Sequence, residues 1–194
     1  MPRKNMFTRE QIVSSALELV REQGMEALTA RGLGEKLGAS SKPIFSWFRS
    51  MEQVQAAVME AADQVYQTYL KSGMQEGKYP PFKAAGMAYI RFAKEEKQLF
   101  RLLFMRDRSH EPHQEKEGAE VAALMTELVQ KNAGLNEQSA RMLYLENWIY
   151  VHGIASMIAT GYLEFDEADI SAMMTDIYRG LTLRAGEVEK NGYR

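Results

Sequence analysis

The residues that follow the turn Gly38-Ala39-Ser40 have the side-chain types that read a DNA duplex. Serine hydroxyls bond to base edges, a lysine neutralises a phosphate, and an aromatic ring packs against a sugar or a thymine methyl group. A three-residue turn containing glycine between two short helices is typical of a helix-turn-helix. The outward positions of its second helix would be Ser41, Lys42, Phe45, Ser46 and Trp47.

Two short helices must hold these side chains. The pattern predicts one helix that starts at Thr29 and ends near Leu37, and a second from Ser41 to about Trp47. Gly34 puts the smallest residue where the two helices cross, and Leu33, Leu37, Ile44 and Phe48 supply apolar contacts. An ordinary αα-hairpin has the same spacing, so the spacing alone leaves both interpretations open. The full predicted DNA-binding set is Thr29, Arg31, Ser40, Ser41, Lys42, Pro43, Phe45, Ser46 and Trp47.

Other chemistry is weakly represented. Asp107, His110, Glu111 and His113 could in principle bind a metal, but a His-x-x-His in a polar loop beside proline is poorly ordered for ligation, so we predict no metal site. The chain has no cysteine, which excludes disulfides, thiolate zinc sites and cysteine nucleophiles. It has no nucleophile elbow, P-loop or Rossmann glycine run, and the pair Glu146 and Glu164 cannot be assigned to acid–base work. We therefore expect no enzyme, no catalytic residue and no cofactor.

Helical periodicity dominates the chain, and no period-2 run predicts a sheet. We predict an all-α fold of about nine helices. Thr8 and Gln11 form a capping-box pair at the start of the first helix, which Gly24 ends. The most apolar stretch, from Trp148 to Leu163, is shorter than the ~20 residues of a membrane-spanning helix, so we interpret it as a buried core helix. The remaining helices are expected at 51–71, from 81, at 98–105, 119–131, 139–160 and 167–187. No signal peptide is recognisable, and we expect a cytoplasmic protein.

A family resemblance covers about a quarter of the chain. The stretch FTREQIVSSALELVREQGMEALTARGLGEKLGASSKPIFSWFRSMEQV, from Phe7 to Val54, resembles the amino-terminal domain of the TetR family of bacterial transcriptional repressors. The residues that carry the match are Gly24, Thr29, Gly38 with Ser40, and Phe45 with Phe48. The segment WIYVHG, residues 148–153, also resembles a Trp-x-x-x-His-Gly segment from one branch of the family. Two positions depart: Phe45 stands where tyrosine is usual, and Met51 where lysine is usual, so two phosphate contacts are weakened.

The resemblance implies a division of labour. Residues 1–50 would form the DNA-binding domain, and residues 51–194 a helical domain for ligand binding and dimerisation. It implies a repressor that binds an operator and is released by a small effector, which we expect to be mostly apolar or aromatic. His152, four residues after Trp148, would supply a polar group to the pocket, although for each single candidate, His152 included, a place in the core is the favoured interpretation. The candidate effector residues are Tyr89, Phe92, Phe104, Met105, Met125, Tyr144, Trp148 and His152.

A dimer is expected through the last two helices. The last helix carries more apolar surface than one stripe against its own chain needs, at steps of three and four residues: Met173, Met174, Ile177, Tyr178 and Leu181. A symmetric homodimer would place two recognition helices ~34 Å apart on a near-palindromic site.

The charge is distributed unevenly along the chain. The net charge is −2, but residues 1–50 carry eight Lys or Arg against five Asp or Glu, a net of +3, and residues 51–194 carry 16 against 21, a net of −5. A basic amino-terminal segment followed by an acidic remainder predicts salt-sensitive DNA binding of modest strength. The weakened contacts at Phe45 and Met51 keep an alternative open: a helical small-molecule-binding protein whose helix-turn-helix has little DNA affinity.

Overall fold

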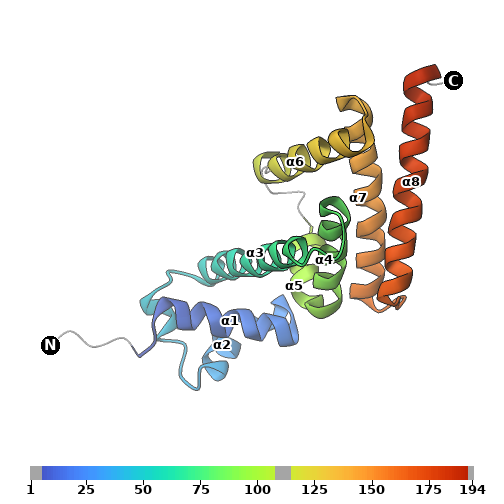
Figure 1. The fold of residues 1–194 in the computed structure, drawn as a ribbon. Coiled ribbons are helices and arrows are strands. Elements are labelled where there is room, and N and C mark those ends of the chain that lie inside the picture. Colours follow the sequence, from blue (N-terminus) through green and yellow to red (C-terminus); the bar gives the residue numbers. More distant parts are fainter. Residues whose placement is uncertain (1–5, 108–114, 192–194) are drawn as a thin grey trace. The chain divides into compact units, whose positions relative to one another are not determined.

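The computed structural model describes residues 6–107 and 115–191, with side chains from residue 121 in the second range. Within these ranges the chain forms eight α-helices and two short 3₁₀ segments and no strand, which confirms the predicted all-α class (Figure 1). The helices are α1 Arg9–Gln23, α2 Ala30–Lys36, α3 Met51–Gln75, α4 Pro81–Glu95, α5 Lys97–Phe104, α6 Glu115–Ala133, α7 Glu137–Thr160 and α8 Glu167–Asn191, and the 3₁₀ segments are η1 Met25–Ala27 and η2 Ile44–Ser46.

The chain packs as two compact units. The first runs through Thr68 and includes Glu95–Arg106, and the second consists of Tyr69–Lys94 and the chain from Asp107 onward. Helix α5 therefore packs with the amino-terminal helices, although α4, which precedes it, packs in the second unit. The predicted functional division at residue 50 is not a packing boundary, and it stays a prediction.

The first unit is built on α1. Thr8 caps this helix as predicted: its hydroxyl accepts from the Gln11 amide at 3.2 Å, and the Gln11 side chain accepts from the Thr8 amide at 2.9 Å. The helix ends at Gly24, also as predicted. Its buried face packs in a core whose members are all less than a tenth exposed: Ile12, Ala16, Leu19, Val20, Leu33, Ile44, Phe48, Val54 and Val58.

The predicted second helix of the helix-turn-helix is wrong in its type. Only Ile44–Ser46 is helical between α2 and α3, and it is a single 3₁₀ turn. Pro43 has no amide hydrogen and disfavours helical geometry at the residue before it. Only four residues then separate Pro43 from the buried Phe48, too few to repay the cost of nucleating an α-helix. We call residues 41–48 the reading turn.

In the second unit α7 and α8 run antiparallel, side by side (Figure 1). Asn136 caps α7, because its side chain accepts from the Ser139 amide at 3.0 Å, and Gly161 ends the helix in the left-handed conformation. The core cluster of this unit consists of Val129, Leu135, Ala140, Leu143 and Ala185. Helix α6 starts at Glu115, four residues before the predicted position. No helix among the described residues is long and apolar enough to cross a membrane.

Candidate DNA interface and effector site

The turn between α2 and the reading turn depends on two glycines. Gly38 has a φ of +63°, a left-handed conformation that favours glycine. A Cβ atom on Gly34 would lie 3.0 Å from the Ala39 carbonyl oxygen and 3.3 Å from the Ser41 amide nitrogen, which is tighter than ordinary van der Waals contact. A side chain here would require the Ala39–Ser41 backbone to move by a few tenths of an ångström, so the close approach favours glycine at the crossing.

The side chains predicted to contact DNA lie at the surface of the first unit. Phe45 is 45% exposed and Trp47 44%, which is high for residues of this size. Their neighbours Ile44 and Phe48 are buried and anchor the turn in the core, so the turn has two apolar residues in the core and two at the surface. The other exposed members of the predicted set are Thr29, Arg31, Ser40, Lys42 and Ser46, and the half-buried ones are Ser41 and Pro43.

Several of these side chains also have partners within the chain. The Thr29 hydroxyl accepts from the Gly32 amide at 3.0 Å and caps α2. The Arg31 guanidinium pairs with Glu35 one turn later, at 2.9 Å, which raises the pKa of Arg31 through the hydrogen bond and the opposite charge. The Ser46 hydroxyl donates to the Pro43 carbonyl at 2.6 Å. Thr29 and Ser46 therefore also stabilise the local backbone.

Sequence reasoning missed two contacts that fasten the reading turn to the start of α1. The Trp47 indole nitrogen donates to the Phe7 carbonyl oxygen at 2.9 Å. The Arg9 guanidinium carbon lies 5.3 Å from the centre of the Phe48 ring, within cation–π range. The sequence gives no signal for either contact, because both link residues about 40 positions apart.

Three of the predicted effector residues meet in the second unit. The Tyr89 hydroxyl from α4 lies 2.8 Å from Nδ1 of His152 on α7. The Trp148 ring stacks on the His152 ring with centroids 5.3 Å apart and 14° between planes. Burial lowers the pKa of His152, so the neutral imidazole is favoured. The cluster combines a buried phenol, a half-buried imidazole and an indole that is 42% exposed.

The other predicted effector residues are dispersed. Phe92 and Met125 are buried in the second unit, and Tyr144 is half-buried there, where burial raises the pKa of its phenol. Phe104 and Met105 belong to the first unit, where the Phe104 ring packs edge-on to the Tyr66 ring at 5.1 Å. The described contacts therefore bring together Tyr89, Trp148 and His152.

The five predicted dimer residues on α8 mostly face their own chain. Met174 is 3% exposed, and a Cβ atom on Gly86 of α4 would lie 2.4 Å from its Cε atom. Tyr178 and Leu181 pack against the core cluster, and Tyr178 also contacts the Phe82 ring at 5.4 Å. Met173 and Ile177 are half-buried. Packing within the chain accounts for Met174, Tyr178 and Leu181, and the interface itself stays a prediction.

A different apolar face lies open on α7. We call it the α7 stripe: Met142, Leu145, Ile149 and Met157, which are 42%, 42%, 57% and 39% exposed. Their steps of three, four and eight residues place them on one side of the helix. On α8, Leu183 is 71% exposed. The prediction that the 148–163 segment is a buried core helix is therefore wrong for its outer side, where large apolar side chains are exposed.

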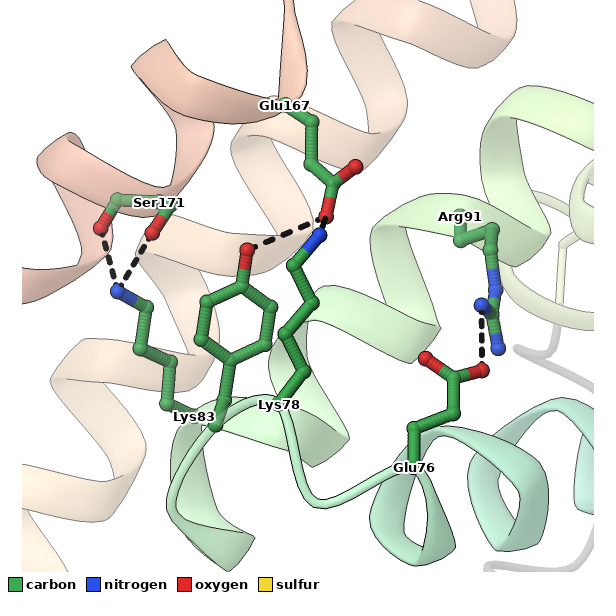
Figure 2. A network of polar contacts seen from close by, with 7 residues as sticks. Glu76, Lys78, Lys83, Arg91, Glu167 and Ser171 are labelled. Carbon is green, nitrogen blue, oxygen red and sulfur yellow. Dashed lines mark hydrogen bonds and ion pairs between the residues drawn. The ribbon is translucent and has the colours of Figure 1, made fainter.

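A polar network joins the segment between α3 and α4 to α8 and lines a groove of about 630 Å³ (Figure 2). Lys78 pairs with Glu167 at 2.6 Å, and Tyr79 donates to the same carboxylate at 3.1 Å.

The Lys83 ammonium donates to the Ser171 carbonyl and to the hydroxyls of Ser171 and Thr175, at 2.7 to 2.8 Å. Burial, and then the nearby Arg179, lower the pKa of Lys83. Since an ammonium has three protons, these three acceptors saturate it, and we interpret Lys83 as a structural link between α4 and α8.

The described residues contain no group of three or more His, Cys, Asp or Glu side chains placed to hold a metal ion. Asp107 is exposed at the end of the first described range. The other candidate ligands, His110, Glu111 and His113, lie outside the described residues.

Comparison with known proteins decides the family. A family model described as a tetracyclin repressor-like C-terminal domain matches residues 82–181, which is 100 of the 194 residues and just over half of the chain. The chain belongs to the TetR family. The range matched by the family model lies mostly in the second unit, whereas the resemblance in the sequence rested mainly on residues 7–54. Two separate parts of the chain therefore point to the same family of transcriptional regulators.

Individual relatives and solved structures resemble the chain as well. The chain is 37% identical over 57 residues to the class C tetracycline repressor protein of Escherichia coli, a match that covers 29% of this chain and 26% of that protein. It is 24% identical over 181 residues to an HTH-type transcriptional regulator of Mycobacterium tuberculosis, covering 93% and 81% of the two chains. A protein of unknown function from Rhodococcus sp. RHA1 has the same fold, with a TM-score of 0.70 and 22% identity over 94% of this chain and 99% of that one. A TetR variant from Acinetobacter baumannii AYE in complex with minocycline matches with a TM-score of 0.52 and 17% identity, over 97% and 99%.

Proposed function

We propose that this TetR-family chain is a repressor that binds a near-palindromic operator as a homodimer and is released by a small, mostly apolar effector. The observation that carries the proposal is the reading turn, which presents Lys42, Phe45 and Trp47 at the surface of a basic amino-terminal segment. An αα-hairpin that only packs would have no reason to expose two large aromatic side chains there. The proposed role of the turn is to enter the major groove.

The dimer is proposed to form through the α7 stripe with Leu183 of α8. This keeps the predicted pair of helices but changes the residues, because the α8 residues named from the sequence pack largely within their own chain. Exposed apolar side chains at helical spacing on the long α7 form a continuous surface that a second copy would cover. Burying four such side chains supplies the hydrophobic part of association.

The effector is proposed to bind beside the Tyr89–His152–Trp148 cluster. An indole with an exposed face offers stacking to an aromatic compound, and the phenol–imidazole pair offers a hydrogen bond that fixes its orientation. Because burial favours neutral His152, the site suits an uncharged ligand or one with a single polar group.

The deciding experiment is a gel-shift titration of the full chain against its own upstream DNA, with and without candidate aromatic ligands, at two salt concentrations. A repressor binds this DNA more tightly than a random duplex, weakens as salt rises, and is released by a ligand that a Trp148→Ala variant no longer senses. Ligand binding without any DNA affinity would instead support the alternative of a helical small-molecule-binding protein. Equal, salt-independent affinity for every duplex would contradict the proposal.

A further inference from the structure

The backbone hydrogen bonds of the reading turn are too few to fix its orientation in the first unit. They belong to a single turn: Ile44 to Ser41 at 3.1 Å, Ser46 to Pro43 at 3.3 Å, and Trp47 and Phe48 to Ile44 at 3.1 Å. One 3₁₀ turn has poor hydrogen-bond geometry and gains nothing from the cooperativity that stabilises a longer helix. Its orientation must therefore come from side chains that fasten it to the rest of the first unit.

Two kinds of contact are available for this. Ile44 and Phe48 are 0% and 3% exposed and fix how deeply the turn sits in the core. Apolar packing has little directional preference, so it fixes depth better than rotation. The hydrogen bond from the Trp47 indole nitrogen to the Phe7 carbonyl is directional and comes from the exposed side of the turn.

The acceptor of this bond is itself held in place. Phe7 precedes Thr8, and the capping box between Thr8 and Gln11 fixes the backbone where α1 begins. Arg9, on the other side of Thr8, lies over the Phe48 ring. The last two residues of the reading turn, Trp47 and Phe48, thus each contact the start of α1.

We propose that Trp47 is a positioning residue for DNA recognition: its indole N–H, bonded to the Phe7 carbonyl, sets the angle at which Lys42 and Phe45 meet the duplex. The inference rests on the proposed DNA-binding function. An indole has a single N–H donor, and here the protein itself uses it, so Trp47 does not donate to a phosphate. This adds a positioning role to the ring contact expected of Trp47.

Positioning and phosphate contact have different signatures on DNA. A residue that neutralises a phosphate raises the affinity for every duplex and adds about 0.9 to the slope of log affinity against log salt. A residue that orients the turn raises the affinity for the operator relative to random DNA and leaves that slope unchanged. A merely structural residue lowers both affinities together, because it changes the fraction of folded protein.

The test uses the full chain and three variants. Trp47→Phe keeps an aromatic ring and removes the N–H, and Lys42→Ala removes a charge from the same turn. Tyr162→Phe is the control, an aromatic substitution at a 76% exposed position in the second unit. We expect Trp47→Phe to weaken binding to the upstream DNA about three- to tenfold, the range of one hydrogen bond, with unchanged binding to random DNA and an unchanged salt slope. Lys42→Ala should weaken both and lower the slope, and Tyr162→Phe should leave both affinities and the slope unchanged.

A second measurement does not depend on the folding of Trp47→Phe. The chain has two tryptophans, so a ¹⁵N-labelled sample gives two indole N–H signals, and Trp148→Phe assigns them. We expect the Trp47 signal to be protected from solvent exchange in both free and DNA-bound protein. Fast exchange in the free protein, a lower salt slope for Trp47→Phe, or unchanged operator affinity would each overturn the inference. Failure of the unmodified chain to bind any duplex would instead overturn the proposed function, and the inference with it.

Discussion

The reading turn and the α7 stripe both expose large apolar side chains, but they are supported in different ways. In the reading turn, Phe45 and Trp47 lie in or next to a single 3₁₀ turn, which is held in place by the buried side chains of Ile44 and Phe48. The α7 stripe stands on a 24-residue helix that is capped by Asn136 and Gly161 and makes its own ladder of backbone hydrogen bonds. A short turn takes its position from a few tertiary anchors, whereas a long helix holds its exposed face without them.

This difference determines what a substitution does in each region. In the turn, losing a buried anchor removes both stability and the geometry of the exposed side chains. On α7, changing an exposed residue leaves the helix intact and alters only what binds to its face. Three experiments are given in order of expected effect: the first two test this contrast, and the third tests the other, packed side of α7.

The largest effect is expected in the turn, where two phenylalanines three positions apart have opposite surroundings. Phe48→Ala should lower the free energy of unfolding by about 3–5 kcal/mol, because a buried aromatic ring leaves a cavity. Phe45→Ala, at a 45% exposed position, should change it by no more than about 0.5 kcal/mol while weakening DNA binding. Urea denaturation and gel shifts measure the two quantities. Equal loss of stability in both variants would show that the turn is not anchored by Phe48.

The next effect is on association. Ile149→Glu places two like charges at the centre of the proposed interface, which costs several kcal/mol when a second copy approaches. We expect light scattering at micromolar concentration to change from dimer mass to monomer mass, with the helical circular dichroism signal unchanged. Tyr162→Glu, at a 76% exposed position beyond the end of α7, is the control and should remain dimeric. A dimeric Ile149→Glu variant would move the interface elsewhere.

The smallest effect concerns His152. Burial lowers its pKa below the ordinary 6.5, so in mildly acidic solution the unfolded chain binds a proton that the folded chain does not. Stability from this group is therefore present above pH 6.5 and is lost as the pH falls through that range. His152→Asn keeps an acceptor for the Tyr89 hydroxyl and cannot titrate, so its free energy of unfolding should fall less between about pH 7.5 and pH 5.5. Parallel curves for the two proteins would contradict the burial of the imidazole.

Local signals in the sequence predicted much of the fold. The Thr8–Gln11 capping box, the Thr29 cap and the stops at Gly24 and Gly38 all lie where the pattern indicated, because caps and left-handed turns depend on residues within four positions of each other. Helix α7 starts two residues before the predicted Ser139, since the Asn136 cap was overlooked. The reading turn was predicted as a helix because periodicity outweighed the effect of Pro43 on so short a segment.

The candidate sites were predicted less completely. The exposed positions of Lys42, Phe45 and Trp47 followed from the resemblance and from the turn. The dimer residues on α8 stay a prediction, because an apolar stripe such as that of Met174 has the same periodicity whether it faces its own chain or a partner. The contact between Tyr89 and His152 joins residues 63 positions apart, and no local pattern indicates it.

By itself, the sequence determined that the chain is all-α and that its basic amino-terminal segment contains a helix-turn-helix pattern with glycine at the turn. It also indicated the family, which the comparisons then confirmed. These properties depend on backbone propensity, capping and charge, which act over a few residues. Tertiary structure decided which apolar faces are covered, that the indole of Trp47 bonds to Phe7, and that the imidazole of His152 meets Tyr89. The physical reason is that burial and directional side-chain bonds belong to pairs of surfaces, and the chain brings those surfaces together only when it folds.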